Sequence, residues 1–325
     1  MDFQKRFQTQ IKWLLQGDVV IRYQTKRDLI ETTVKKLAKE QNKILKQGWG
    51  RELMRLQDRN GTWSNSLYSP KWTSTFYTLL LLKIFNAKPD KNIKKACKIL
   101  LDSGFYAPDG GINYWKSWKC GECCVTGMLL GMLCFFGIED ERIDLMVKYL
   151  ISQQMSDYGF NCNRPRGAVH SSFHTTISVL EGLWEYEKVA PKSALIKSVR
   201  QMQDEGIEFL LQHHLYKSDK SGKTVHPQMV KLAFPPRWHY DILRCLDYFQ
   251  DKGIKKEKRM VDAVCLLKEK QTKDGFWKLE TKYRAKVFFD MEKVGKASRW
   301  NTLRVLRVLK WWDKARWRSQ LTIDN

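Results

Sequence analysis

Apolar residues along this chain recur three or four positions apart, which is helical spacing, and strand-like alternation is absent over any useful length. Two kinds of helical segment alternate. Amphipathic segments carry apolar residues on one face, whereas FYTLLLLKIF (76–85) and GMLLGMLCFFGI (127–138) are apolar nearly all round. Both runs are shorter than the roughly 20 residues that cross a bilayer. The pattern therefore predicts an all-α protein with buried helices and no membrane span.

An aromatic residue or cysteine with polar neighbours precedes each apolar segment. SPKWTSTFYTLLLLK places Trp72 before threonine and serine, and ASRWNTLRVLRVLKWW places Trp300 before asparagine and threonine. Successive anchors are separated by 49, 51, 50, 65 and 62 residues, a near-constant period that indicates one repeated unit. The six anchors are Tyr23, Trp72, Cys123, Phe173, Trp238 and Trp300.

A second recurring piece lies between the anchors, where an amphipathic segment ends in a glycine turn toward an aromatic residue. LMRLQDRNGTW ends on Trp63, DGGINYW on Trp115, ISQQMSDYGF on Phe160 and LKEKQTKDGFW on Trp277. About fifty residues hold two helices of roughly 15 to 18 residues and two loops. The unit is therefore predicted to be a helical hairpin with an outer amphipathic helix and an inner apolar helix.

Six such hairpins bury their inner helices best by closing into a ring. The predicted fold is a single (α/α)6 toroid, or barrel, spanning residues 1–325 as one domain. Its inner helices are expected to start near residues 23, 72, 123, 173, 238 and 300. If they run parallel around an axis, their first turns converge and the anchors line one cavity. In the alternative, Trp72, Trp238 and Trp300 only pack between neighbouring helices.

The glycine turns resemble those of the squalene-cyclase and protein-prenyltransferase β-subunit superfamily, whose members are α/α toroids. The matching triplets are Gln57, Gly61 and Trp63, then Gln271, Gly275 and Trp277, with Gln154, Gly159 and Phe160 less similar. The resemblance spans residues 10–315 and implies a terpenoid cyclase-like toroid. Triterpene cyclases of this kind have two toroidal domains and an Asp-x-Asp-Asp motif. This chain has length for one toroid and lacks the motif, which disfavours protonation-initiated squalene cyclisation.

The same resemblance implies a metal site. Prenyltransferase β subunits hold zinc through an Asp-x-Cys pair and a later histidine, and Glu122-x-Cys124 with His174 occupies comparable positions here. Thiolate, imidazole and carboxylate also form a sensible catalytic zinc set that leaves one position open. In the alternative, the cysteines are small buried hydrophobic residues and the histidines bond across helix starts.

Arginines beside the anchors indicate anion recognition. Arg299 directly precedes its anchor, Arg244 lies within the next two turns, and helix N-termini facing a cavity would add positive potential. The alternative is that these arginines form ion pairs between helices. The residues expected to contact substrate are Tyr23, Trp72, Trp238, Arg244, Arg299 and Trp300.

Acid and base groups are also concentrated near the anchors. His239 and Asp241 follow Trp238, and with His174 and Glu122 they could exchange protons if their side chains meet. The residues expected to carry chemistry are Glu122, Cys124, His174, His239 and Asp241.

The formal charge of +23 indicates attraction to anions, which include phosphorylated small molecules and anionic membrane surfaces. The lysines are scattered along solvated segments and no nucleic-acid-binding motif occurs, so no nucleic-acid partner is expected. The chain opens without a signal-peptide pattern and its eight cysteines lack framework spacing, which together predict a cytoplasmic protein with free thiols.

These features favour an enzyme acting on a hydrophobic, anionic, isoprenoid-type substrate in the toroid cavity. Three alternatives stay open: a non-catalytic toroid that binds a lipid or peptide, a zinc-dependent enzyme resembling lanthionine cyclases, and a carbohydrate-active toroid. The sequence leaves the oligomeric state undetermined.

Overall fold

The computed structural model describes residues 3–115 and 117–313, and this part of the chain is mostly helical. Its sheet content is one antiparallel pair, β1 (Phe105–Tyr106) and β2 (Gly111–Ile112), together with isolated bridges. The predicted all-α class is confirmed. None of the helices described is long and apolar enough to cross a membrane.

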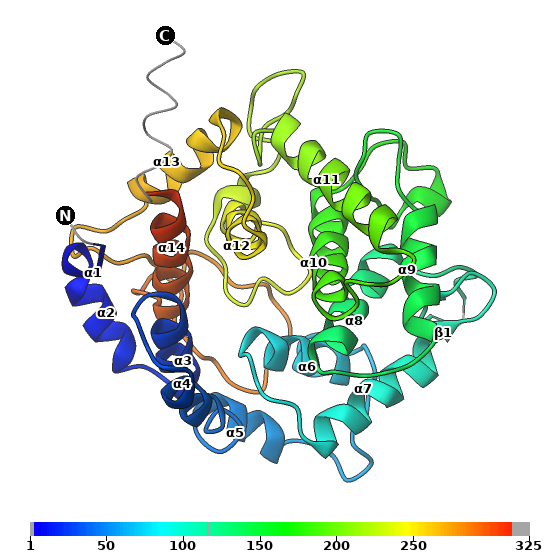
Figure 1. Cartoon of the computed structure of the whole chain (residues 1–325), viewed down its shortest axis with the longest axis horizontal. Helices are drawn as coiled ribbons and strands as arrows, with labels where there is room; N and C mark the ends of the chain where they lie inside the picture. Colours follow the sequence, from blue (N-terminus) through cyan, green and yellow to red (C-terminus); the bar gives the residue numbers. More distant parts are fainter. Residues whose placement is uncertain (1–2, 116, 314–325) are drawn as a thin grey trace.

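Six helices, here called the inner helices, surround a common centre (Figure 1). In chain order, α6 packs on α8, α8 on α10, α10 on α12, α12 on α14, and α14 on α3. The inner helices are α3 (Val19–Asp28), α6 (Thr75–Ile84), α8 (Cys123–Phe135), α10 (Phe173–Val189), α12 (Ile242–Lys252) and α14 (Arg299–Trp312).

Side chains connect the remaining neighbours, α3 and α6. Gln24 Nε2 donates to the carbonyl of Ile84 at 2.8 Å, and Arg27 Nη1 donates to Asn86 Oδ1 at 2.6 Å. Gln24 Oε1 also accepts a hydrogen bond from Arg307 Nη2 on α14 at 2.9 Å. One amide therefore links three inner helices.

The other helices lie outside the inner ones in Figure 1. Each of α5, α7, α9, α11 and α13 precedes an inner helix in the chain, and the connecting segments before α12 and α14 are longer than the other three. These outer helices are α2 (Gln8–Leu15), α5 (Gly48–Arg55), α7 (Lys91–Gly104), α9 (Arg142–Ser152), α11 (Ile196–Gln212) and α13 (Val261–Glu269). Shorter pieces are α1 (Phe3–Arg6), α4 (Val34–Gln41), and the 3-10 turns Arg164–Arg166, Pro227–Val230 and Lys258–Met260.

The glycine turns repeat at the level of hydrogen bonds. Gln57 Nε2 donates to the carbonyl of Gly61 at 2.9 Å, and Gln271 Nε2 donates to that of Gly275 at 2.9 Å. A residue one or two positions after the glycine then donates its backbone N–H to a threonine hydroxyl at the start of the next inner helix. The pairs are Trp63 with Thr75, Ile112 with Thr126, Phe160 with Thr176, and Trp277 with Thr302, at 2.8 to 3.1 Å.

The second glycine turn, before α8, differs from the sequence expectation. Ile112, not Trp115, occupies the buried position, and Trp115 is 37% exposed. The reason is the β1–β2 hairpin, which closes at Gly110 with a left-handed φ of 82° and turns Ile112 inward.

The helices α8 and α10 touch backbone to backbone. A Cβ atom added at Gly182 would lie 2.2 Å from the carbonyl oxygen of Gly127. Only glycine permits this approach, and the two helices form a rigid pair on one side of the ring.

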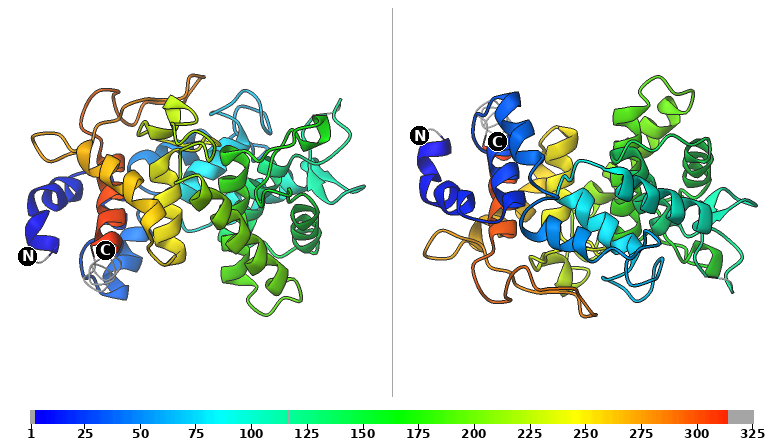
Figure 2. Two further views of the ribbon diagram at one scale, coloured as in Figure 1. Left: turned by 90° about the horizontal axis from the view of Figure 1, so that it is seen from above. Right: turned by 90° about the horizontal axis from the view of Figure 1, so that it is seen from below.

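The inner helices begin at or near the predicted anchors. Cys123 and Phe173 are the first residues of α8 and α10, and Trp300 is the second residue of α14. Tyr23 lies in the middle of α3. Trp72 and Trp238 precede α6 and α12 because Trp72 and Arg237 have left-handed φ angles of 74° and 57°, which delay the helix. Figure 2 shows the segments that lead into α6, α12 and α14 along one edge of the molecule.

Candidate functional site

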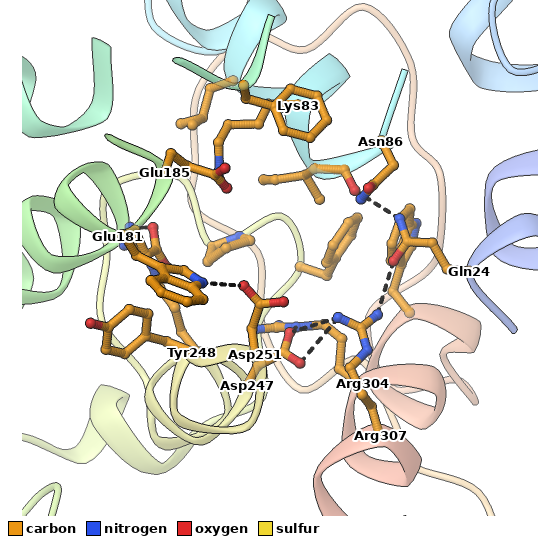
Figure 3. Close-up of a pocket in the computed structure, with 18 of the residues that line it drawn as sticks. Gln24, Lys83, Asn86, Glu181, Glu185, Asp247, Tyr248, Asp251, Arg304 and Arg307 are labelled. Carbon is orange, nitrogen blue, oxygen red and sulfur yellow. Dashed lines mark hydrogen bonds and ion pairs between the residues drawn. The ribbon is translucent and has the colours of Figure 1, made fainter. Parts of the chain in front are cut away.

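A cavity of about 270 Å³, here called the ring cavity, lies among the inner helices. All six contribute to its lining, mostly through their later turns, and Figure 3 shows polar side chains directed into it. The lining side chains that bear charge are Arg27, Lys83, Glu181, Glu185, Lys188, Arg237, Arg244, Asp247, Asp251, Arg304 and Arg307.

Ion pairs between different inner helices join most of these charges. Arg244 on α12 donates to both carboxylate oxygens of Glu181 on α10, at 2.9 and 2.7 Å. Arg304 and Arg307 on α14 both reach Asp247 on α12, at 3.2 and 3.1 Å. Such pairs offset the cost of burying each charge and hold neighbouring helices in register.

Two further ion pairs complete the polar wall. Lys83 on α6 lies 3.0 Å from Glu185 on α10, and Lys188 lies 3.0 Å from Asp251. Asp251 also accepts from Trp184 Nε1 at 2.7 Å. Each of the four cavity carboxylates therefore has a cationic partner.

Arg237 differs from the other cavity cations. It is only 6% exposed, and within residues 3–115 and 117–313 its guanidinium makes no hydrogen bond or ion pair. Its guanidinium carbon lies 5.1 Å from the centroid of the Trp72 ring. Burial lowers the pKa of Arg237 to about 10, so it still carries its charge at neutral pH. A buried cation without a carboxylate attracts an anion from outside the protein.

An aromatic wall adjoins Arg237. Phe234 and Trp300 stack with ring centroids 4.1 Å apart and planes 14° apart, and Phe85 stacks behind Trp300 at 5.8 Å. Both Phe234 and Trp300 line the ring cavity. The cavity therefore combines an unpaired cation with an apolar surface.

The opposite mouth of the ring is filled by an aromatic cluster, here called the plug. His239 stacks on Tyr283 with centroids 3.4 Å apart, and Trp238 stacks on His239 at 3.7 Å. Trp72 Nε1 donates to the carbonyl of Tyr283 at 3.1 Å. The anchors before α6 and α12 thus meet at one mouth, but they pack against each other and lie outside the ring-cavity lining.

A second pocket of about 510 Å³ lies beside the plug and has three histidines, His174, His226 and His239, in its lining. His174 Nδ1 accepts from the backbone N–H of Tyr240 at 2.7 Å, which leaves the ring proton on Nε2. Burial, with the positive charge of Arg244, lowers the pKa of His174 to about 4. Burial also lowers the pKa of His239 to about 3. Both imidazoles are neutral at pH 7 and lie 5.7 Å apart between ring centroids.

Asp241 has a structural role at the start of α12. Its Oδ1 accepts from the backbone N–H of Arg244 at 2.7 Å and so caps α12. The carboxylate is completely buried, and burial raises its pKa. Its Oδ2 has no hydrogen-bond partner among the residues described.

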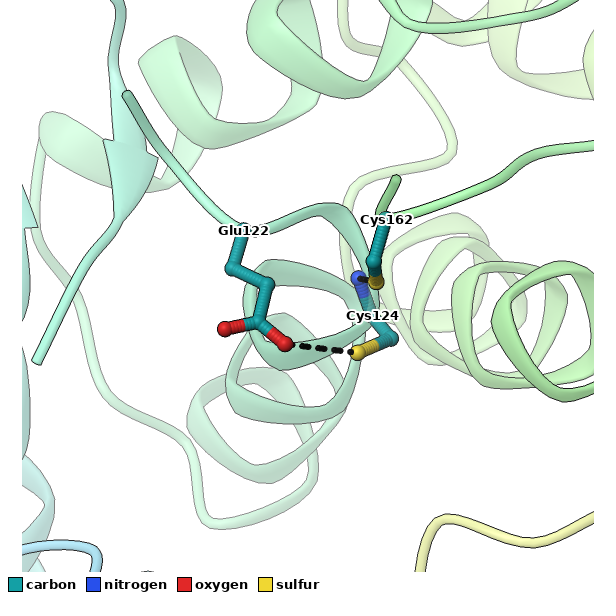
Figure 4. Close-up of side chains that lie close together, drawn as sticks. All are labelled: Glu122, Cys124 and Cys162. Atoms are coloured by element: carbon teal, nitrogen blue, oxygen red, sulfur yellow. Dashed lines mark hydrogen bonds between the residues drawn. The ribbon is translucent and has the colours of Figure 1, made fainter. Parts of the chain in front are cut away.

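Glu122 and Cys124 lie together, as their spacing suggests, but their third neighbour is Cys162 (Figure 4). One ligand atom from each of these three residues lies within 4.8 Å of the others. His174 does not belong to this group, because its side chain contacts Trp238 and His239. Burial raises the pKa of Glu122.

The remaining predicted contact residues separate into two groups. Arg244 and Trp300 line the ring cavity. Tyr23 is buried beneath Arg27, whose guanidinium carbon lies 5.7 Å from its ring centroid. Arg299 lies over Trp13 at 4.3 Å, on the outer side of α14.

Comparisons with known proteins give few matches. No family model and no curated protein matches this chain. Among solved structures, a variant of the type II terpene cyclase MstE from Scytonema, in complex with its substrate geranylgeranyl dihydroxybenzoate, is similar over 79% of this chain and 93% of that chain. The sequence identity is 14% and the TM-score is 0.33.

Proposed function

We propose that this chain is a terpenoid cyclase-like α/α toroid of one domain, and that its ring cavity holds a small molecule with an anionic group and an apolar body. The observation that carries the proposal is Arg237, a buried cation without a protein partner among the described residues, beside the stacked rings of Phe234 and Trp300. The closed succession of inner-helix contacts supports the toroid.

The anionic group and the apolar body of the proposed ligand correspond to two parts of the cavity lining. An anionic group beside Arg237 supplies the charge that burial there demands, and a phosphate or carboxylate can accept two hydrogen bonds from a guanidinium. An apolar body gains by covering Phe234 and Trp300, whose stacked rings line the ring cavity together with Arg237. An isoprenoid diphosphate has both parts.

The side chains that line the ring cavity are suited to binding a ligand and not to transferring a proton. Its four carboxylates are held in ion pairs, so a proton donor or a carboxylate base for sugar chemistry is not available from them without breaking a pair. This favours the binding half of the proposal over acid-initiated cyclisation and over carbohydrate hydrolysis in this cavity.

If the chain is an enzyme, the pocket beside the plug is the second candidate place for proton transfer. Two neutral imidazoles, His174 and His239, line it together. A neutral imidazole can accept a proton at neutral pH, and His174 Nε2–H can donate a hydrogen bond to a bound group. Glu122, Cys124 and Asp241 lie outside this pocket's lining.

Calorimetric titration of the full chain tests the proposal with three probes: geranyl diphosphate, inorganic diphosphate and geraniol. We expect geranyl diphosphate to bind more tightly than either of its parts. We expect Arg237→Met to weaken binding at least about tenfold, which is roughly 1.4 kcal/mol. Arg55→Met removes the same charge from an exposed position and serves as the matched control.

The outcome that overturns the proposal is equal affinity of the Arg237→Met variant and the unaltered chain for geranyl diphosphate. Mass spectrometry of the same mixtures after incubation separates the two forms of the proposal. Conversion of the bound probe indicates an enzyme, and its recovery unchanged indicates a binding protein.

A further inference from the structure

Two loops outside the ring cavity bring a carboxylate and two thiols together. Glu122 and Cys124 flank the start of α8, and Cys162 lies in the segment between α9 and α10. Cys124 Sγ lies 3.5 Å from Glu122 Oε1, and ligand atoms of all three residues lie within 4.8 Å of one another. We propose that Glu122, Cys124 and Cys162 bind a divalent transition-metal cation of the zinc class.

The distances are those of a ligand set that needs little adjustment. Around a tetrahedral zinc ion with bonds of about 2.3 Å to sulfur and about 2.0 Å to oxygen, neighbouring ligand atoms are separated by roughly 3.5 to 3.8 Å. The sulfur-to-oxygen distance between Cys124 and Glu122 already falls there. All three ligand atoms lie within 4.8 Å of one another, so they must approach by about 1 Å to bind one ion. Rotation of the side chains supplies a shift of this size.

The two thiols are also oriented by groups behind them. Cys162 Sγ accepts a hydrogen bond from the backbone N–H of Cys124 at 3.1 Å and another from Thr175 Oγ1 at 3.4 Å. N–H and O–H donors to sulfur stabilise a thiolate, and such outer contacts fix metal ligands in place.

Metal binding at these three residues has a simple proton balance. A bound dication stabilises thiolates directly. Binding then releases the thiol protons of Cys124 and Cys162 to solvent, and no electron is transferred.

The ligand set differs from the one that the sequence implies. Cys162 takes the place expected for His174, so two thiolates and one carboxylate replace a single thiolate, a carboxylate and an imidazole. Soft thiolate ligands favour zinc over magnesium or calcium.

The site is separate from the ring cavity. Glu122 and Cys162 line a pocket of about 260 Å³ together with Trp115, Trp118 and Arg166, and no residue is common to the two linings. Three protein ligands leave a fourth position, which this pocket can fill with water or with an anionic ligand near Arg166. The proposal is therefore independent of the function proposed for the ring cavity.

Cobalt(II) titration of the reduced full chain under anaerobic conditions tests the proposal. Thiolate bonds to cobalt give a charge-transfer absorption band in the near ultraviolet. We expect one cobalt ion per chain, displaced by zinc. The Cys124→Ser and Cys162→Ser variants should each lower the band per bound cobalt to about half, because one of two thiolates is lost, and the double variant should abolish it.

Two further variants keep the test decisive. Cys265→Ser removes an exposed thiol on α13 and should leave the band unchanged. His174→Asn retains an acceptor for the Tyr240 N–H and should also leave it unchanged, which distinguishes Cys162 from His174 as the third ligand. Circular dichroism verifies that each variant is folded.

Three results overturn the proposal. The first is a chain that binds no cobalt or zinc while its thiols are reduced. The second is an unchanged band in a folded Cys162→Ser variant, and the third is loss of the band in His174→Asn. Glu122→Gln gives a separate readout, because it should retain the thiolate band while weakening cobalt binding at least about tenfold, as expected when a carboxylate ligand is lost.

Discussion

The imidazole of His239 lies flat on the phenol ring of Tyr283, with ring centroids 3.4 Å apart and planes 3° from parallel. Tyr283 belongs to the segment between α13 and α14, whereas His239 precedes α12. Since Trp72 Nε1 also bonds the carbonyl of Tyr283, this one residue joins three hairpins at the plugged mouth. Burial, together with the positive charges of Arg244 and Lys71, lowers the pKa of His239, so protonation of His239 in place destabilises the plug.

Stability should therefore fall as the pH is lowered. The pKa values of His174 and His239 are lowered to about 4 and about 3, so the folded protein stays neutral there while the unfolded chain takes up protons below about pH 6.5. The unfolded state then binds more protons, and the free energy of unfolding decreases from about pH 6.5 toward pH 4. The decrease is up to roughly 1.4 kcal/mol per pH unit for each histidine.

Urea unfolding between pH 7 and pH 4.5 measures this dependence. His239→Phe preserves an aromatic ring against Tyr283 and removes one titrating group, so its stability should depend less steeply on pH. A variant with the same dependence as the unaltered chain would assign the effect to other groups.

Arg237 is expected to destabilise the protein when no ligand is bound. Replacing it with methionine removes a buried charge that no described carboxylate compensates, and we expect the free energy of unfolding to rise by about 1 kcal/mol in the absence of ligand. Urea unfolding at pH 7 provides the measurement. A loss of stability larger than that of Arg55→Met would mean that the guanidinium has a stabilising partner.

Breaking one cavity ion pair should be much more costly than breaking an exposed one. Glu181→Gln leaves Arg244, whose side chain is 4% exposed, without its charged partner, and we expect a loss of about 2 kcal/mol or more. Glu52→Gln breaks an exposed pair with Arg55 and should cost less than about 0.5 kcal/mol. Chemical unfolding of both variants gives the comparison, and similar losses would contradict the prediction.

The contact between α8 and α10 should tolerate no added methyl group at its closest point. Gly182→Ala places Cβ 2.2 Å from the Gly127 carbonyl oxygen, and the helices must separate. We expect a loss of about 1–3 kcal/mol despite the better helix propensity of alanine.

Gly131→Ala is the matched control on α8. Its Cβ would lie 3.3 Å from the Gly182 Cα and farther from every other neighbour. Its stability should remain within about 0.5 kcal/mol of the unaltered chain. Thermal unfolding of the two variants compares them directly, and equal losses would show that glycine is required along the whole contact.

Much of the fold is encoded locally. The apolar segments around Leu80 and Leu130 form the buried helices α6 and α8. The turns at Gly61 and Gly275 direct the tryptophan two positions later toward an inner helix. The second glycine turn, before α8, could not be predicted in the same way. Its strand pair depends on hydrogen bonds between Phe105–Tyr106 and Gly111–Ile112, which residue spacing does not reveal.

The sites were less accessible to sequence reasoning. Anchors mark where helices begin, but a cavity is lined according to which face of each helix turns inward, and here the later turns face it. Arg244 and Trp300 lie near the start of their helices and also on the face that lines the cavity, whereas Trp72 belongs to the plug. Cys162 carries no signal of its own, because it lies in a loop 38 residues from Cys124 and only the packing of α8 on α10 brings them together.

The amide of Gln24, which bonds α6 through Ile84 and α14 through Arg307, has a consequence for how the protein is made. A ribosome delivers α3 long before α14, because 283 residues separate Gln24 from Arg307. Until α14 emerges, α3 and α12 lack the inner helix that packs between them, and the surfaces that would contact it stay uncovered. The ring cavity therefore forms only after α14 has been synthesised, and shorter translation products expose apolar surface that chaperones recognise.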